Sequence, residues 1–279
     1  MTPPMSARPL AVVLLLAACG EAPVWSRTDA IVGGVDDADD PAVVSVTVAG
    51  FPACSGTLVS PTAVLTAGHC ANLLGSLAST EVRFGRDAVK STKRVVVGEQ
   101  RTHPGYTAEG APWDFAMLQL TKPVTDVAPL PLGTQALTDG DVGAPIRHVG
   151  YGISDERART GGGFKRQVTF PITRVEPLVV WSVGPGEQTC DGDSGGPGLL
   201  SRSGQEQLIA VVSNGPDCAD AGWDGRVDVV ADWVNSTASE WARDAGPASH
   251  PPKTGCSTGL PGFEAMSLLV VIAALCRRS

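Results

Sequence analysis

The central part of the chain is built from short apolar runs in which Val, Ile and Thr alternate with polar residues. The runs read AVVSVTVAG, EVRFG, KRVVVGEQ, DFAMLQL, IRHVGYG, KRQVTFPITRV and LIAVVSNG, and Gly, Pro, Asp or Ser separates them. This pattern predicts short β-strands, and strands at such spacing are typical of a sandwich or of barrels. Residues 231–245 predict a helix instead, with Trp233, Val234 and Trp241 on one face. The pattern therefore predicts an all-β body followed by a single helix.

The composition fits a globular protein. The chain has 279 residues, of which 43% are apolar and 18% charged, and this is enough for a sizeable core. Its 33 glycines and 22 prolines favour many turns between short strands. The formal net charge of −8 argues against nucleic acid and against an anionic membrane surface as the main partner.

The N-terminal segment 1–19 has the form of a secretory signal, because Arg8 precedes an apolar run from Leu10 to Ala18. The run closes in LAAC, which resembles a bacterial lipobox. In that interpretation Cys19 is acylated and becomes the new N-terminus. The alternative is ordinary signal cleavage nearby, after Gly20.

The C-terminal end also indicates that the protein is directed to the cell surface. A linker rich in Pro, Gly and Ser, residues 246–262, leads to an apolar tail, residues 263–279, that ends in an arginine pair before the last serine. The apolar stretch is shorter than the ~20 residues that span a bilayer. The arrangement resembles a bacterial surface-sorting tail, and TGCSTG around Cys256 resembles the kind that myxosortase recognises. A weak membrane anchor without processing, or a disordered tail, is the alternative. Both ends predict export to the cell surface, the outer membrane or the medium of a bacterium.

Four cysteines remain between these end segments: Cys54, Cys70, Cys190 and Cys218. Four cysteines allow three pairings, and the spacing alone does not choose among them. In an exported chain they are expected to form disulfides. The chain has no C-x-x-C pair and no acidic loop that resembles a calcium site, so we expect neither a metal ion nor a cofactor.

The stretch TCDGDSGGPG places Ser194 among glycines, which packing alone does not favour because glycine loses the most conformational freedom on folding. A serine becomes a nucleophile only beside a base, usually a histidine that a carboxylate orients. Ser194 is therefore a candidate nucleophile, and this role requires a histidine and an acid elsewhere in the chain.

Only four histidines are available. His250 lies in the linker, His148 falls within a predicted strand, and His103 precedes a proline. His69 lies in VLTAGHC, where small residues and a cysteine fix the local backbone, so it is the candidate base. The candidate acid is Asp114 in PWDFAMLQL, which opens an apolar strand and is expected to be partly buried, a position that requires a partner for its charge.

The motifs TAGHC, DFAML and GDSGGP occur in this order, and IVGG precedes them at positions 31–34. Together they resemble the trypsin/chymotrypsin family of serine peptidases over residues 31–245. The resemblance implies two antiparallel six-stranded β-barrels with the site in the cleft between them and a C-terminal helix. It also implies that residues 20–30 are a propeptide.

The resemblance assigns roles to the candidate residues. Ser194 would attack the peptide carbonyl, His69 would take and return the proton, and Asp114 would orient and stabilise the imidazole. The backbone N–H groups of Gly192 and Ser194 would form the oxyanion hole.

The resemblance further implies that the protein is made as a zymogen. Cleavage would free the amine of Ile31, which would pair with Asp193 and order the oxyanion hole. Many family members carry Arg or Lys immediately before this isoleucine, whereas here the sequence is RTDA. Self-activation with trypsin-like specificity is therefore not expected, although Arg27 lies nearby.

The resemblance pairs Cys54 with Cys70 and Cys190 with Cys218. It assigns the substrate pocket to Gln188, Ser213, Asn214, Gly215 and Gly225. Gln188 stands where family members that cut after Arg or Lys carry an aspartate, so a strong preference for basic side chains is not supported. Asp191 and Asp224 could supply a negative charge, and we interpret both as solvated loop acids.

The sequence as a whole predicts a serine endopeptidase with protein or peptide substrates. A surface binding module that keeps the fold without activity is the alternative from another class. Inactive relatives usually lose a member of the triad, and here His69, Asp114 and Ser194 are all present. The sequence does not separate a protease that processes one surface partner from one with a broad degradative role.

Overall fold

The computed structural model describes residues 34–107, 113–184, 188–215, 218 and 222–244, without the side chain of Asn214. All of these belong to the unit Met1–Gly246, and the second compact unit, Pro247–Ser279, lies outside the described residues. The predictions for residues 1–30, for Ile31, and for the linker and tail with Cys256 therefore concern parts of the chain that the structure does not describe.

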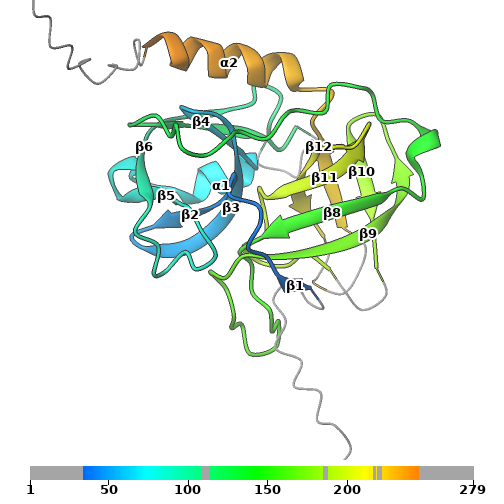
Figure 1. The fold of residues 1–279 in the computed structure, drawn as a ribbon, viewed down its shortest axis with the longest axis horizontal. Helices are drawn as coiled ribbons and strands as arrows, with labels where there is room; N and C mark the ends of the chain where they lie inside the picture. Colours follow the sequence, from blue (N-terminus) through cyan, green and yellow to red (C-terminus); the bar gives the residue numbers. More distant parts are fainter. Residues whose placement is uncertain (1–33, 108–112, 185–187, 216–217, 219–221, 245–279) are drawn as a thin grey trace, which may run out of the picture. The chain divides into compact units, whose positions relative to one another are not determined.

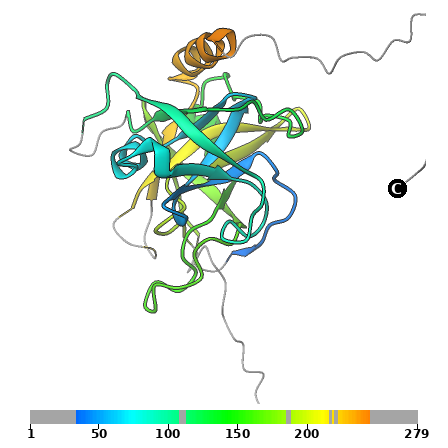
Figure 2. The ribbon, with the colours of Figure 1, turned by 90° about the vertical axis from the view of Figure 1, so that its left-hand side faces the viewer.

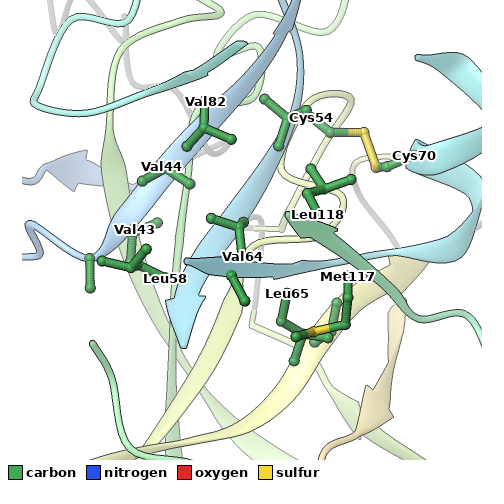
Figure 3. Packing of buried hydrophobic residues seen from close by; sticks show 14 of the residues in the cluster. Val43, Val44, Cys54, Leu58, Val64, Leu65, Cys70, Val82, Met117 and Leu118 are labelled. Atoms are coloured by element: carbon green, nitrogen blue, oxygen red, sulfur yellow. A yellow bond between two sulfur atoms is a disulfide. The ribbon is translucent and has the colours of Figure 1, made fainter. Parts of the chain in front are cut away.

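The first half of the described chain forms a closed antiparallel β-barrel. Its strands are β2 (Val43–Val48), β3 (Phe51–Ser60), β4 (Ala63–Thr66), β5 (Thr80–Arg83), β6 (Arg94–Thr102) and β7 (Ala116–Leu120), in the order β2-β3-β4-β7-β6-β5. Figure 3 shows Val43, Val44, Leu58, Val64 and Val82 among the side chains that fill this part of the core. The predicted runs thus form β2, β5, β6 and β7, whereas β3 and β4 were not among them.

The second half forms another antiparallel barrel. Its strands are β8 (Pro145–Gly150), β9 (Arg166–Val175), β10 (Val179–Ser182), β11 (Pro197–Arg202), β12 (Gln205–Asn214) and β13 (Gly222–Arg226). They run in the order β9-β10-β13-β12-β11-β8, and pairing of β9 with β8 closes the ring. The short strand β1 (Val35–Asp36) pairs with β9 as a seventh strand. Figure 1 shows the two groups of strands side by side, so the predicted fold of two six-stranded barrels is confirmed.

Helix α2 (Ala231–Asp244) forms where the sequence predicts the C-terminal helix. It buries Val234, Thr237 and Trp241, and Figures 1 and 2 show it above the strands. The guanidinium of Arg101 lies 5.2 Å from the centre of the Trp241 ring. Helix α2 is therefore held by an apolar face and by a cation–π contact from β6.

Short helical segments also occur that the sequence did not predict. They are α1 (Gly68–Leu73) and the 3₁₀ segments Leu77–Ser79 and Asp139–Asp141. Segment α1 is too short to show an apolar periodicity.

Both disulfides join the cysteines in the expected pairs. Cys54 bonds Cys70, with Cα atoms 6.2 Å apart, and Cys190 bonds Cys218, with Cα atoms 4.8 Å apart. Figure 3 shows the first bridge linking β3 to α1. The pairing that the family resemblance implied is thus confirmed.

Candidate active site

The position of His69 is set by the start of α1. Its backbone N–H donates to Asp114 Oδ1 at 2.7 Å, and its ring Nδ1 lies 2.7 Å from Asp114 Oδ2. A Cβ on Gly68 would lie 3.0 Å from Asp114 Oδ1 and from the Tyr106 ring. Glycine at this position therefore allows the carboxylate to approach the backbone and the ring of His69 together.

Asp114 is buried, and three donors surround its carboxylate. Besides the two groups of His69, the hydroxyl of Ser213 donates to Oδ2 at 2.6 Å. A carboxylate that accepts several hydrogen bonds is stabilised in its charged form. Because Oδ2 is an acceptor, the neutral His69 ring carries its proton on Nδ1 and leaves Nε2 as a base.

Ser194 lies in the turn that leads into β11 and is partly exposed. Its carbonyl accepts the N–H of Ser55 at 2.9 Å and lies 3.5 Å from Cys70 Sγ. The same sulfur is 3.7 Å from His69 Nε2. The Cys54–Cys70 disulfide thus borders both the nucleophile turn and the imidazole.

Gly195 explains how the turn comes so close to His69. A Cβ there would lie 2.0 Å from Thr66 Oγ1 and 3.0 Å from the Ala67 nitrogen, and its φ is +83°. Only glycine fits this contact without strain. Among the described hydrogen bonds, none joins the Ser194 hydroxyl to the His69 ring. Such bonds are often long before substrate binds.

Two N–H groups of this turn lack an acceptor among the described residues, those of Gly192 and Ser194. By contrast, the N–H of Asp193 donates to the Cys190 carbonyl at 2.9 Å, and that of Gly195 donates to the Val212 carbonyl at 2.8 Å. Gly192 has φ +98°, and a Cβ on it would lie 2.9 Å from the Gly152 Cα. The turn therefore holds two unpaired donors on either side of Asp193, at the positions expected for an oxyanion hole.

Asp193 is fully buried behind this turn. Its carboxylate accepts the N–H of Gly152 at 2.8 Å and the N–H of Cys190 at 2.9 Å. Glycine at positions 150 and 152 provides the space, because a Cβ at either would lie within 2.4 Å of the carboxylate oxygens. Burial raises the pKa of Asp193 to about 6, against the lowering effect of these two N–H groups. The site therefore holds a carboxylate that lacks a close cation among the described residues.

The predicted pocket residues lie on two strands and the segment before the nucleophile. Gln188 is buried, and its side-chain oxygen accepts the N–H of Thr189 at 3.0 Å. Ser213 is buried on β12, and its hydroxyl goes to Asp114. Asn214 ends β12, and Gly215 follows it in an exposed position. Ser213 is thus a partner of the candidate acid, a contact that the sequence did not predict.

Gly225 lies on β13 against Phe115. A Cβ on Gly225 would be 2.5 Å from Phe115 Cζ, so glycine there leaves space for the residue that follows Asp114. The structure thereby connects this predicted pocket residue to the strand that carries the candidate acid.

The interpretation of Asp224 as a solvated loop acid is wrong. Asp224 lies on β13, is 4% exposed, and its Oδ2 is 2.8 Å from His148 Nε2. These residues are 76 positions apart, so no local signal could reveal the pair. Asp191, in contrast, is exposed as expected and forms an ion pair with Arg159 at 2.9 Å.

The described residues show one cluster of side chains with metal-binding atoms: Cys54, His69 and Cys70. Both cysteines are in a disulfide, so neither offers a thiolate. Among the described residues, no helix is long and apolar enough to cross a membrane.

Comparison with known proteins agrees with the fold. The family model described as Trypsin matches residues 31–234. Trypsin iota of Drosophila melanogaster is 26% identical over 253 residues, which cover 82% of this chain and 97% of that protein. Trypsin 5G1 of Aedes aegypti is 28% identical over 75% of this chain and 85% of its own length. Brachyurin of Leptuca pugilator is 28% identical over 74% of this chain and 97% of its own length. The chain therefore belongs to the trypsin family and is a serine endopeptidase, with proteins or peptides as substrates.

Proposed function

We propose that this endopeptidase cuts peptide bonds with Ser194 as nucleophile, His69 as base and Asp114 as the acid that orients the imidazole. The observation that carries this proposal is the fixed His69–Asp114 pair beside a turn with two unpaired N–H groups. Ser194 attacks the carbonyl carbon, and His69 Nε2 takes the hydroxyl proton. The same proton then passes to the leaving amine, and an acyl-enzyme remains until water hydrolyses it.

Asp114 and the oxyanion hole stabilise the charges that develop in this reaction. When His69 becomes an imidazolium, its Nδ1–H already faces the Asp114 carboxylate at 2.7 Å. The carbonyl oxygen becomes an oxyanion, for which the N–H groups of Gly192 and Ser194 are the donors. One such donor contributes about 2.7–4 kcal/mol of transition-state stabilisation.

A fluorophosphonate probe, which labels an activated serine, tests this assignment. The proteolytically activated full-length protein should be labelled, and Ser194→Ala should abolish both the labelling and the hydrolysis of a peptide substrate. Ser201→Ala is the matched control, since Ser201 lies exposed on the neighbouring strand β11 and should leave both unchanged. Activity that survives in Ser194→Ala would exclude the proposed nucleophile, and no labelling of the folded, activated wild type would favour a binding module.

We also propose that the protein is a zymogen that is activated by cleavage between Ala30 and Ile31. The buried carboxylate of Asp193, with a pKa raised by burial, offers a place for the new amine. Val35 pairs with Gln167, and Gln167 pairs with Val149, the residue before Gly150. Two strand spacings are about 10 Å, and the four residues from Ile31 to Val35 reach about 13–14 Å when extended. The amine is therefore within reach of Asp193.

Blocking the amine tests the zymogen proposal. Cleaved protein in which the Ile31 amine has been carbamylated, as mass spectrometry can verify, should label as weakly as the uncleaved precursor. Equal labelling of the blocked and the free forms would contradict this activation mechanism.

We further propose that the termini export and tether the enzyme at a bacterial surface. Residues 1–19 act as the signal, with Cys19 acylated, and the tail around Cys256 is sorted or anchored. Cleavage after Ala30 would separate the lipid from the enzyme and leave the tail as its tether. Metabolic labelling with a fatty acid should be lost in Cys19→Ser, and Cys256→Ser should change the share of enzyme on the cell. Unchanged results in both variants would favour ordinary signal cleavage and an unprocessed tail.

A further inference from the structure

A cluster of buried charges holds the first described residues of the chain against the second barrel. We call it the Asp37–Asp40 clamp, and it consists of Asp37, Asp40, Arg147 and Lys165. The Lys165 ammonium donates to the Asp40 carbonyl and lies 3.7 Å from Asp37 Oδ2. Arg147 binds the Asp40 carboxylate with two nitrogens, at 2.6 and 3.0 Å. The side chains of Lys165 and Asp37 are 2% and 0% exposed.

Such a cluster is costly to bury. Burial lowers the pKa of Lys165 and raises the pKa of Asp37. Replacement of a buried ion pair by apolar residues is often neutral or stabilising, so buried charges are weak evidence for stability alone. The presence of these buried charges is better explained if the activity of the protein depends on the fixed position of the segment that carries Asp37 and Asp40.

The clamp lies immediately after the proposed cleavage point. The segment Val35–Asp40 has only a two-residue strand, β1, and both residues of β1 are exposed. The N–H of Asp37 donates to the Lys165 carbonyl at 3.0 Å, which continues the β1–β9 pairing into the clamp. The other ion pairs of this segment join Arg86 and Arg166 to Asp36, whose side chain is 50% exposed, and pairs of such an exposed carboxylate contribute little. The buried charges are therefore the firm attachment of this segment to β8 and β9.

We propose that Lys165 and Arg147 are positioning residues for activation. By holding the segment Val35–Asp40, they keep the new amine of Ile31 close to Asp193, and so they maintain the ordered oxyanion hole. This inference rests on the proposed zymogen mechanism. The physical basis is effective concentration, because a short, firmly attached tether keeps the inserted state populated, whereas a loosened tether lowers its population.

The working variant removes both charges of one buried pair. Lys165→Met alone leaves Asp37 buried without its counter-charge, which is strongly destabilising. Lys165→Met combined with Asp37→Asn leaves no unpaired charge and should fold. Arg147→Lys is a second variant, which keeps a charge but loses the two-nitrogen contacts with Asp40 and with Glu206 on β12. Asp36→Asn is the matched control, because it removes the exposed pairs of the same segment.

Activation of each variant must not depend on the unknown natural protease. Ser26→Asp, Arg27→Asp, Thr28→Asp and Ala30→Lys create, with the native Asp29, an enteropeptidase site directly before Ile31. The full-length chains are cleaved, and mass spectrometry verifies the new end. The rate of fluorophosphonate labelling is then measured from pH 6 to pH 11, together with Tm.

The alkaline limb of the labelling profile reports insertion of the amine, because only the protonated amine pairs with Asp193. A free α-amino group has a pKa of about 7.7–8.0. Insertion of the amine beside Asp193 raises the pH at which labelling falls to half above this value, by the logarithm of the equilibrium constant for insertion. The side chains whose fields lower the pKa of Asp193 are His148 on β8 and Arg166 on β9, and neither is substituted in any variant.

We expect the paired variant, Lys165→Met combined with Asp37→Asn, to lower the equilibrium constant for insertion of the amine at least tenfold. The alkaline limb of the labelling profile then moves by at least one pH unit toward neutrality. Arg147→Lys should move it in the same direction, and Asp36→Asn should leave it in place. A lower Tm with an unmoved limb in the paired variant and in Arg147→Lys would overturn the proposal and leave the clamp a structural role. Equal labelling of cleaved and uncleaved wild type would instead contradict the zymogen mechanism itself, so the two failures are distinguishable.

Discussion

The described part of the chain contains two histidine–aspartate pairs with nearly the same geometry and different surroundings. In the first barrel His69 Nδ1 lies 2.7 Å from Asp114, and in the second His148 Nε2 lies 2.8 Å from Asp224. The side chain of His69 is 35% exposed, whereas that of His148 is 1% exposed. A histidine–aspartate contact is therefore insufficient to define a catalytic site.

The two pairs differ most in the surroundings of the histidine ring nitrogen that does not contact the aspartate. His69 Nε2 is 3.7 Å from the disulfide that borders the Ser194 turn, and the His69 side chain is partly exposed. His148 Nδ1 is buried without a partner among the described residues, and its ring centre lies 5.5 Å from that of Phe170. The first imidazole can exchange a proton with a reacting group, and the second is enclosed in the core of its barrel.

The acids differ as well. Asp114 accepts three hydrogen bonds, two from His69 and one from Ser213. For Asp224 the hydrogen bond that the structure shows is the one to His148. A buried charge with more donors is held in one orientation, so the first pair is suited to catalysis and the second to structure.

The difference between the two pairs is tested most strongly by substituting Asn for the aspartate in each pair. Asp114→Asn should lower kcat by about 10⁴-fold, because the amide no longer fixes the proton on His69 Nδ1. Asp224→Asn should change kcat by less than about tenfold, since His148 does not reach the reacting atoms. Steady-state kinetics on activated protein measures both. A loss in Asp224→Asn as large as that in Asp114→Asn would mean that the two pairs do not differ in function.

Asp193 extends the comparison to a third buried carboxylate, which has backbone donors and no histidine in contact. Its pKa rises from 3.8 to about 6 in the folded chain because of burial. Its contribution to stability is therefore fully present below about pH 4 and is lost as the pH rises through 6. The shift corresponds to about 3 kcal/mol.

We expect this loss in the precursor, where no amine pairs with Asp193, and not in the cleaved form. Urea unfolding at pH 4.5 and 7.5 measures the part of the loss that falls between these values, about 2 kcal/mol, with Ser194→Ala in the background to prevent self-digestion. Asp193→Asn provides the control, since it removes the titrating group and should flatten the pH dependence of the precursor. The same pH dependence in the precursor with and without Asp193→Asn would show that another group is responsible.

Seven of the barrel strands could be predicted because each carries its own sequence signal, whereas the predicted runs did not include β3, β4, β10, β11 and β13. The run around Val43 alternates in sequence and lies in a barrel wall, and the face of Val234 and Trp241 marks α2. Segment α1 has no such signal, although it positions His69. It forms where the chain leaves β4, and its start is held by the hydrogen bond from the His69 N–H to Asp114.

Contacts between distant residues could not be predicted from the residues alone. Asp224 and His148 approach each other only because β13 and β8 belong to one closed barrel. Ser213 donates to Asp114, a residue 99 positions away in the other half of the chain. For the disulfides, the spacing left three pairings open, and only the family resemblance chose the correct one.

Burial of the second pair predicts an effect on stability. Asp224→Asn should lower the free energy of unfolding by about 1–3 kcal/mol, because the ring of His148 loses a charged partner in a sealed environment. Thermal unfolding measures the change. Asp191→Asn is the matched control, since its ion pair with Arg159 is exposed and should contribute less than about 1 kcal/mol. Equal shifts in Tm for the two variants would contradict the structural role of the buried pair.

The smallest effect concerns the third donor to Asp114. Ser213→Ala removes the 2.6 Å hydrogen bond to Oδ2 but leaves both contacts with His69. We expect kcat/KM to fall about tenfold, which corresponds to about 1.4 kcal/mol of transition-state stabilisation. Ser45→Ala is the matched control, because the buried Ser45 hydroxyl has no hydrogen-bond partner in the described part of the chain. If Ser213→Ala leaves kcat/KM at the value of this control, two donors suffice for Asp114, and the difference between the pairs reduces to the exposure of the imidazole and the neighbouring nucleophile.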